Sequence, residues 1–304
     1  MPNNSTPSQL SAWLLAMRPK TLPAAVAPIA VAAAIAISHS ATPRYDLIVL
    51  AFVCALALQV LVNFANDYFD AKSGVDTDER KGPQRATQSG LISHRSMKLG
   101  IGLAALVSIV AGMPLILAGG WPFAGLGLLC IVAALAYSGG PYPLASHGLG
   151  EVTVFLFFGL IAVVGGSYLF TGEILSIAWW LAFIVGAPIS AIMLVNNTRD
   201  IETDQQANKR TLAVRLGRRG SEQVFSLLVM TPAIVSCVAW GLGLAPWHWL
   251  IAGAITMPLA MRLTRNLHQS EASQLNAVLA NSAQYSLITA LAFSAAILMP
   301  AIRV

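Results

Sequence analysis

The sequence predicts an all-α membrane protein, and three observations support this fold class. Of the 304 residues, 56% are hydrophobic and only 10% are charged, with a mean hydropathy of +0.69, which lies outside the range of ordinary soluble domains. Nine apolar stretches approach the roughly 20 residues that a membrane-spanning helix requires. Most Lys and Arg residues gather in alternate loops between these stretches.

The apolar stretches are expected to form about nine transmembrane helices of one integral-membrane domain that covers residues 1–304. They are residues 22–38, 46–66, 98–118, 121–138, 151–171, 176–197, 222–244, 247–264 and 281–300. Many are rich in Gly, Ala and Ser, small residues that let membrane helices approach closely. A short interfacial helix is expected at residues 13–20. Residues 1–11 are polar and carry no positive charge, so they predict a flexible terminus and not a signal peptide.

The basic residues predict how the spans are oriented. With the N-terminus in the cytoplasm, 16 of the 18 Lys and Arg residues fall in cytoplasmic segments, and only Arg44 and Arg303 fall outside. This bias is typical of the positive-inside rule. It predicts a membrane protein whose N-terminus and loops after spans two and six are cytoplasmic. The net charge of +5 belongs to these loops, so a lipid bilayer and not nucleic acid is the expected partner.

Two acidic clusters each stand at the end of a membrane-length apolar stretch. The first is NFANDYFDAKSGVDTDER at residues 63–80, and the second is NNTRDIETDQQANKR at residues 196–210. Together they hold eight of the thirteen Asp and Glu residues of the chain. Charges close to lipid are costly and usually functional. The alternative is that both clusters are hydrated loop edges in which acids pair with nearby bases.

The spacing within the clusters favours a site for a divalent metal and a polyphosphate. Asn-x-x-x-Asp occurs at residues 66–70 and again at 196–200, which stacks two oxygen donors on one helix face. Mg²⁺ takes oxygen ligands of this kind together with phosphate oxygens. The expected ligands are Asn66, Asp70, Asp200 and Asp204, with Asp67, Asp76 and Asn196 as second choices. The basic residues that follow the clusters are the candidates to bind phosphate: Arg80, Lys81, Arg85, Lys209 and Arg210.

A third segment, AYSGGPYPLASHGLGE at residues 136–151, lies on the same predicted side of the membrane. Its Tyr137, Tyr142 and Glu151 are candidates to reach the cavity, although interfacial side chains at a Gly/Pro turn are an equal alternative. The two acidic clusters end spans two and six. Spans one to four and five to eight are therefore expected to be two related four-helix groups, with the ninth span added.

At these residues the chain resembles the UbiA-type family of intramembrane aromatic prenyltransferases. The resemblance covers nearly the whole chain and rests on three stretches: RPKTLP at 18–23, NDYFDAKSGVD at 66–76 and NNTRDIETDQQANKRTLAVRLG at 196–217. RPKTLP, KRTLAVRLG and the GPQRATQSGLIS stretch are most similar to the branch that acts on 1,4-dihydroxy-2-naphthoate in menaquinone synthesis. Asp76 comes later than the third acid of the commoner family pattern, and this branch tolerates the longer spacing.

The resemblance implies a Mg²⁺-dependent transferase. Mg²⁺ held by both motifs would bind the diphosphate of a polyprenyl diphosphate, whose C1–O bond breaks to leave an allylic carbocation. The cation would alkylate the naphthoate ring carbon that loses CO₂, which gives demethylmenaquinone. The residues that this chemistry implicates are Asp70, Asp200, Asp204, Tyr142 and Tyr137.

Three alternatives remain at this point. The same chemistry on 4-hydroxybenzoate or another phenol is the nearest of them. A membrane CDP-alcohol phosphotransferase would use one compact motif with interior Gly and Arg. A Mg²⁺ transporter would need carboxylates at mid-span, whereas these carboxylates stand at the ends of spans.

Overall fold

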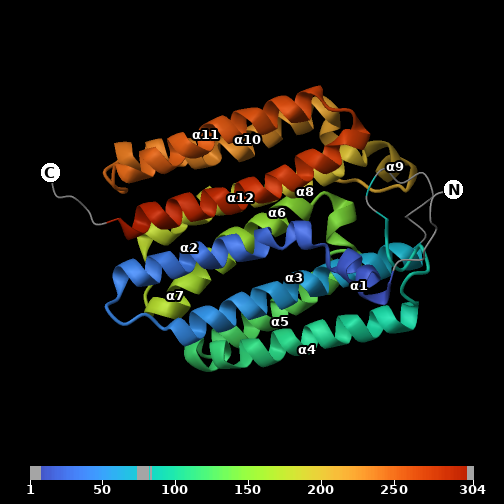
Figure 1. The fold of residues 1–304 in the computed structure, drawn as a ribbon, viewed down its shortest axis with the longest axis horizontal. Coiled ribbons are helices and arrows are strands. Elements are labelled where there is room, and N and C mark those ends of the chain that lie inside the picture. The colour runs from blue at the N-terminus through green and yellow to red at the C-terminus, as the bar shows by residue number, and fades with distance from the viewer. Residues whose placement is uncertain (1–7, 74–81, 83, 300–304) are drawn as a thin grey trace.

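The computed structural model describes residues 8–73, 82 and 84–299, and every regular element in these ranges is a helix (Figure 1). The long helices are α2 Pro23–His39, α3 Tyr45–Ser73, α4 His94–Gly119, α5 Trp121–Ala136, α8 Ser176–Arg199, α10 Leu212–Gly241, α11 His248–Gln269 and α12 Leu275–Leu298. The short elements are α1 Gln9–Met17, η1 Pro19–Thr21, η2 Leu144–His147, α6 Gly150–Val154, η3 Phe155–Gly165, α7 Gly166–Thr171, α9 Ile201–Gln206 and η4 Ala272–Gln274. The long helices lie side by side as a bundle, so the all-helical prediction is confirmed for the described residues.

The predicted spans correspond to helices, but not all of these helices meet the requirements of a membrane crossing. Each of the nine apolar stretches overlaps a helix in the described ranges, with residues 151–171 on the continuous run α6–η3–α7. Within the described residues, five segments are long and apolar enough to cross a membrane: Tyr45–Lys72, His94–Gly119, Gly150–Thr171, Ser176–Arg199 and Leu212–Gly241. A sixth results if α1, η1 and α2, bent by 49°, count as one span. The chain is an integral membrane protein, while nine crossings and the repeat of two quartets stay predictions.

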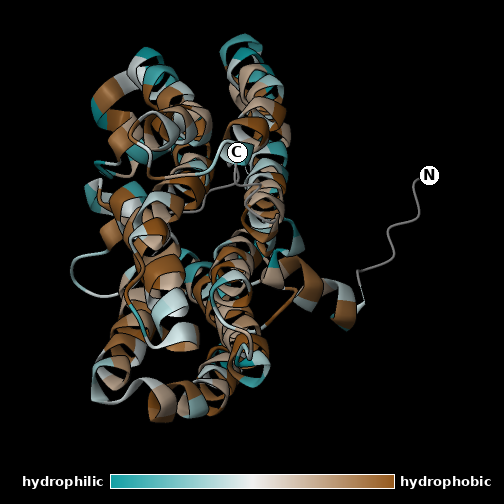
Figure 2. Cartoon of the chain, turned by 90° about the vertical axis from the view of Figure 1, so that its left-hand side faces the viewer, coloured by the Kyte–Doolittle hydropathy of each residue, from teal (hydrophilic) through white to brown (hydrophobic). Residues whose placement is uncertain are grey.

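The outward faces of the bundle are apolar, as a lipid environment requires. α4 is strongly apolar, yet only 22% of its apolar stretch is buried inside the protein. Its Leu103, Val110 and Leu117 are all exposed. Figure 2 shows hydrophobic residues, in brown, on helices throughout the bundle. Because a soluble protein rarely exposes so much contiguous apolar surface, this face fits contact with lipid tails.

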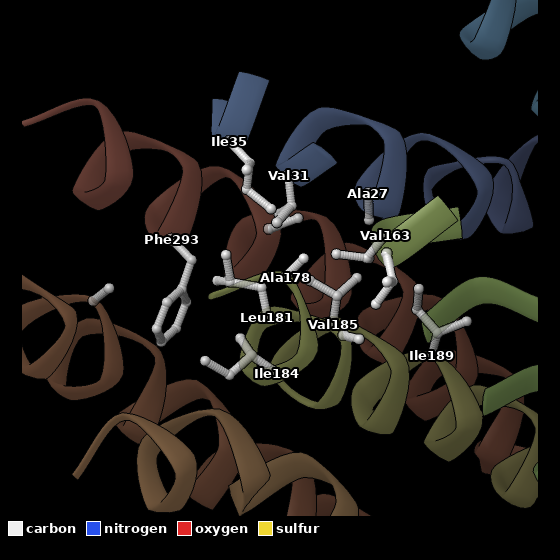
Figure 3. Close-up of a cluster of buried hydrophobic side chains, with 14 of the residues drawn as sticks. Ala27, Val31, Ile35, Val163, Ala178, Leu181, Ile184, Val185, Ile189 and Phe293 are labelled. Carbon is white, nitrogen blue, oxygen red and sulfur yellow. The ribbon is translucent and has the colours of Figure 1, made fainter. Parts of the chain in front are cut away.

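α8 lies at the centre of the bundle, and 67% of its apolar stretch is buried inside the protein. Figure 3 shows its Leu181, Ile184 and Val185 pointing into a cluster shared with α2, η3 and α12. η3 is an 11-residue π-helix, and Gly159 within it meets Gly186 of α8 so closely that an added Cβ would lie about 3 Å from backbone atoms. A helix that is apolar all round is a core helix. α8 therefore holds the second acidic cluster at a defined place.

Two helices extend beyond the apolar pattern. α3 continues past residue 66 to Ser73. α10 begins at Leu212 instead of residue 222, although Gly217 (φ 66°, ψ 178°) breaks its first turn from the rest of the helix. Hydropathy identifies the lipid-spanning part of a helix, while polar turns can continue it into the interface. Likewise α1 begins earlier than the predicted helix at 13–20 and ends at Met17, because Arg18 is left-handed (φ 51°).

The predicted sidedness is testable at two exposed positions. Ser89 follows the first cluster, Gln206 ends α9, and both are exposed. Cysteines placed there, in a Cys237→Ser background because Cys237 is exposed, should resist a membrane-impermeant thiol reagent in intact cells. They should react after lysis. Labelling of either cysteine in intact cells would show that the predicted orientation is wrong.

Candidate functional site

The two acidic clusters meet at one end of a cavity. Asn66 and Asp70 lie in the last turns of α3, Asn196 lies in the last turn of α8, and Asp200 comes directly before α9. Both α9 and this end of α3 lie at the right of Figure 1. The cavity has a volume of about 640 Å³, and residues of both clusters line it. The fold thus brings together two segments that are far apart in the sequence.

The remainder of the cavity is apolar. It is lined by small and hydrophobic residues of α2, α3, α5 and η3, among them Ala25, Pro28, Leu58, Ala133, Phe158 and Ile161. A space that is polar at one end and apolar along the rest suits an amphiphile with an anionic head and a hydrocarbon tail. Ligand sites commonly combine such apolar walls with a few convergent polar groups.

The first cluster is held in place by the segment that follows it. Arg85 donates a hydrogen bond from Nη2 to Asp70 Oδ2, and both side chains line the cavity. Asp67 is only 2% exposed, and its two oxygens accept the backbone N–H groups of Ala86 (3.0 Å) and Thr87 (2.8 Å). Since those N–H groups belong to the residues directly after Arg85, Asp67 fixes the backbone from which Arg85 reaches Asp70.

The second cluster is organised by a buried arginine. Arg199 is 2% exposed and donates two hydrogen bonds to Asp200, from Nε (2.8 Å) and Nη2 (2.6 Å). It also donates to Asn196 Oδ1 (2.9 Å) and to Asn276 Oδ1 at the start of α12 (2.7 Å). A guanidinium can satisfy this set because its five N–H donors form a rigid planar fork. Arg199 therefore fixes Asp200 and joins α8 to α12.

Asp204 shows that negative charge is concentrated here. Burial, opposed by Lys209 and aided by the nearby Asp200, raises the pKa of the Asp204 carboxyl to about 6. Lys209 Nζ lies 3.6 Å from Asp204 Oδ1. A carboxylate destabilised by burial and by a second carboxylate gains from a nearby cation.

The donor set fits a hard divalent cation. Carboxylate and amide oxygens are the ligands that Mg²⁺ takes in proteins, and four of them line this end: Asn66, Asp70, Asp200 and Asp204. In the described part of the chain, no three Asp, Glu, His or Cys side chains are grouped closely enough to hold a metal as they stand. Arg85 and Arg199 instead contact two of the carboxylates. A bound cation would therefore replace an arginine at Asp70 and at Asp200.

The sequence of the chain is similar to those of known prenyltransferases. The model of the family described as "UbiA prenyltransferase family" matches residues 25–299. The chain belongs to the UbiA prenyltransferase family. A Haemophilus influenzae member named 1,4-dihydroxy-2-naphthoate octaprenyltransferase is 37% identical over 301 residues, which cover 96% of this chain and 97% of the relative. A Mycobacterium leprae member of the same name is 39% identical over 254 residues, covering 83% and 84% of the two chains.

Solved structures of UbiA proteins have the same fold. A UbiA homologue from Archaeoglobus fulgidus, bound to GPP and Mg²⁺, aligns with a TM-score of 0.68 at 16% identity, covering 94% of this chain and 99% of that one. An apo UbiA homologue from Aeropyrum pernix also has a TM-score of 0.68, at 13% identity over 89% and 96% of the two chains. At this identity the likeness shows the UbiA fold alone.

Most of the predicted site residues line the UbiA cavity. They are Asn66, Asp67, Asp70, Arg85, Tyr137, Asn196, Asp200, Asp204 and Lys209. Tyr142 and Arg210 are described but are not among its lining residues. Asp76, Arg80 and Lys81 lie outside the described residues. The structure thus brings both aspartate motifs together.

The two tyrosines of the 136–151 segment lie in different environments. Tyr137 is buried and donates a hydrogen bond to Met193 Sδ (2.7 Å). Tyr142 is 57% exposed and stacks on His147, with ring centroids 3.5 Å apart. Between them Gly140 adopts a left-handed conformation (φ 83°) that non-glycine residues rarely adopt, within the turn that separates the two side chains. Tyr137 is therefore the better placed of the two to contact a substrate.

Several lining residues were not among the predicted site residues. Arg18 lies between α1 and η1, where its left-handed backbone ends α1. Arg18 Nη2 is buried and has no hydrogen-bond partner among the residues that the structure describes. The other polar ones include Lys20, Asn197, Arg199, Thr203 and Asn276. Arg18 lies in the RPKTLP stretch and Arg199 in NNTRD, two stretches that carry the family resemblance. Their place at the cavity could not be predicted, because it depends on contacts between segments that are far apart in the sequence.

The role of Asp67 as an anchor is testable by hydrogen exchange. Asp67→Ala removes the acceptor of two backbone N–H groups, and hydrogen bonds to a charged group contribute about 1.5–3 kcal/mol each. Amide exchange in the 85–92 segment should become faster than in the parent protein. Unchanged exchange there would show that other contacts hold the segment.

Proposed function

We propose that this UbiA protein transfers a polyprenyl group from polyprenyl diphosphate to 1,4-dihydroxy-2-naphthoate, with loss of CO₂. The observation that carries the proposal is the cavity with two aspartate-bearing segments at one end and an apolar remainder. The names of the relatives from Haemophilus influenzae and Mycobacterium leprae support the choice of acceptor. The whole chain acts as one domain, and its site opens to the cytoplasmic side of a bacterial inner membrane.

The polar end binds the diphosphate. Arg18, Lys20, Arg85 and Lys209 line it and supply the positive charge. Arg80, Lys81 and Arg210 remain candidates from the sequence. Asn66, Asp70, Asp200 and Asp204 would hold Mg²⁺, as the Mg²⁺-bound homologue from Archaeoglobus fulgidus suggests. When bound, Mg²⁺ supplies electrostatic stabilisation of the charge that develops on the leaving pyrophosphate.

The reaction exchanges one carbon–oxygen bond for one carbon–carbon bond. The allylic C1–O bond breaks, and both electrons leave with the pyrophosphate, where the basic side chains stabilise them. The ring carbon that bears the carboxylate then attacks C1. Release of CO₂ returns an electron pair to the ring, so this step needs no protein nucleophile. The chain's part is to orient both substrates and to keep water from the cation.

The apolar end of the cavity holds the prenyl tail. Each CH₂ group kept out of water is worth about 0.8 kcal/mol, so a long tail keeps the substrate in the apolar region that the cavity and the bilayer provide. Phe158 and Ile161 of η3 form part of this wall. The tail would continue from the cavity into the bilayer, which is the other expected partner.

An assay in membranes tests the proposal. Labelled polyprenyl diphosphate is offered with 1,4-dihydroxy-2-naphthoate, 4-hydroxybenzoate and other phenols in turn. With a carboxyl-labelled naphthoate, one labelled CO₂ should appear for each prenyl group transferred. Efficient prenylation of 4-hydroxybenzoate without turnover of the naphthoate would reject the acceptor, and a product that keeps its carboxylate would reject the decarboxylation.

A further inference from the structure

One wall of the cavity differs from the charged end. Tyr137, Met193 and Asn197 all line it. Tyr137 donates a hydrogen bond to Met193 Sδ (2.7 Å). Met193 and Asn197 are one turn apart on α8, so they share one helix face. A phenol, a thioether and an amide next to one another suit a flat aromatic ring, because sulfur contacts with aromatic rings are favourable.

Behind this wall lies a buried carboxylate. Glu151 is 5% exposed, and its Oε1 accepts a hydrogen bond from Asn197 Nδ2 (2.9 Å). Its Oε2 is buried without a hydrogen-bond partner in the described ranges. The neighbouring Gly150 allows the close approach, since a Cβ there would lie 3.2 Å from Tyr137 Oη and 3.6 Å from Met193 Cγ. Glu151 does not line the cavity itself, so it acts on the cavity through its neighbours.

The contact with Glu151 determines which atom Asn197 can offer. Asn197 donates from Nδ2 to Glu151 Oε1, so the NH₂ end of the amide faces Glu151. The carbonyl end of Asn197 is then the end available to the cavity. The adjacent Asn196 differs, because its oxygen already accepts from Arg199. Two neighbouring asparagines are thereby oriented differently, one by an arginine and one by a glutamate.

The chemistry of this wall selects its ligand. A carbonyl oxygen is a hydrogen-bond acceptor, so it attracts a neutral donor and does not bind phosphate or carboxylate oxygens. A ring hydroxyl is the donor that an aromatic acceptor provides. We propose that Glu151 is a positioning residue that turns the Asn197 oxygen towards the cavity, where it accepts a hydrogen bond from a ring hydroxyl of the acceptor. This inference rests on the proposed function.

Kinetics of three variants test it. Glu151→Leu removes the acceptor for Asn197 Nδ2, and Asn197→Ala removes the oxygen itself. Loss of one such hydrogen bond, about 1.4 kcal/mol, should raise the KM for the acceptor about tenfold. The KM for the polyprenyl diphosphate should stay within about twofold, because the basic residues that bind it are separate. Glu151→Gln keeps an oxygen that can accept from Asn197, so its KM for the acceptor should stay close to that of the parent protein.

A second measurement separates orientation from a structural effect. The two monomethyl ethers of the naphthoate each lack one hydroxyl, and the parent protein should discriminate against one of them. A site built to bind a hydroxyl rejects the analogue that lacks it, so Glu151→Leu and Asn197→Ala should both lose this discrimination. The double variant should lose no more than either single variant, since both act on one hydrogen bond.

Different results of these experiments would overturn the role of Glu151 and the proposed acceptor. An equal rise in both KM values, unchanged discrimination between the ethers, or additive losses in the double variant would overturn the role of Glu151. So would a Glu151→Gln variant as impaired as Glu151→Leu. If the parent protein prenylates another phenol instead of the naphthoate, the proposed acceptor fails. The same variants measured with that phenol and its methyl ether then test the role of Glu151.

Discussion

Replacement of Asp70 or Asp200 by alanine should lower prenyl transfer by about 10²–10³-fold or more, the loss typical when stabilisation of developing charge is removed. Both carboxylates line the polar end of the cavity, and each contacts an arginine there. Loss of either would leave a metal site incomplete and an arginine without its carboxylate. Turnover should be measured in membranes at matched protein levels, with saturating Mg²⁺.

Asp46 provides the matched control. It lies in the first turn of α3, the helix that carries Asp70 near its other end, and it pairs with Arg44 in the same way. That pair is exposed, so it contributes little. Asp46→Ala should retain activity within about twofold of the parent. Near-normal turnover in Asp70→Ala or Asp200→Ala would reject that aspartate as part of the site.

Replacement of Arg199 by leucine should impair both turnover and stability. Breaking a buried ion pair by removing one partner costs about 3–5 kcal/mol, and Arg199 also holds Asn196 and Asn276. Arg199→Lys keeps the charge but not the planar fork, so it should recover part of the stability and remain about tenfold or more below the parent in kcat/KM. Thermal unfolding in detergent and turnover in membranes measure the two effects.

Arg218 provides the control for the Arg199 variants. It bonds Glu222 through Nε (2.6 Å) and the backbone oxygens of Leu267 and Ser270 through Nη2, and it is not among the lining residues of the cavity. Arg218→Leu should lower stability while turnover of the folded fraction stays near that of the parent. Equal catalytic losses in the Arg199 and Arg218 variants would mean that Arg199 acts only through the fold.

The all-helical fold was largely predictable from the sequence because lipid imposes long apolar helices. The helix ends were not, since α3 runs to Ser73 in polar turns that hydropathy does not identify as part of a span. A short helical turn also begins at Leu212 and is separated from the rest of α10 by the break at Gly217. The 49° bend before α2 was also not predicted. The left-handed backbone at Arg18, which ends α1, is a conformation that arginine rarely adopts and was not predicted either.

The candidate site was predictable where its residues share one helix turn. Asn66 and Asp70 are neighbours on α3 by helical spacing alone. Asp200 instead lies in the break between α8 and α9, where Arg199 bonds both it and Asn196. Arg18 was not predicted, because only the packing of α1 against α3 brings it to the cavity. The spacing also could not show that Asp67, one residue from Asn66, accepts two backbone N–H groups. Contacts between distant segments require the tertiary structure.

The pairing of Asp70 with Arg85 and of Asp200 with Arg199 has a thermodynamic consequence. The two carboxylates proposed to hold a cation are thus paired with arginines, and one of these, Arg85, is also proposed to bind the diphosphate. A cation that takes the carboxylates frees the arginines, so each ligand lowers the cost of binding the other. Such coupling is reciprocal and typically changes affinity about 5–150-fold. The polyprenyl diphosphate should therefore bind weakly without Mg²⁺, and Mg²⁺ should bind weakly without the diphosphate. The two ligands are expected to occupy the site together.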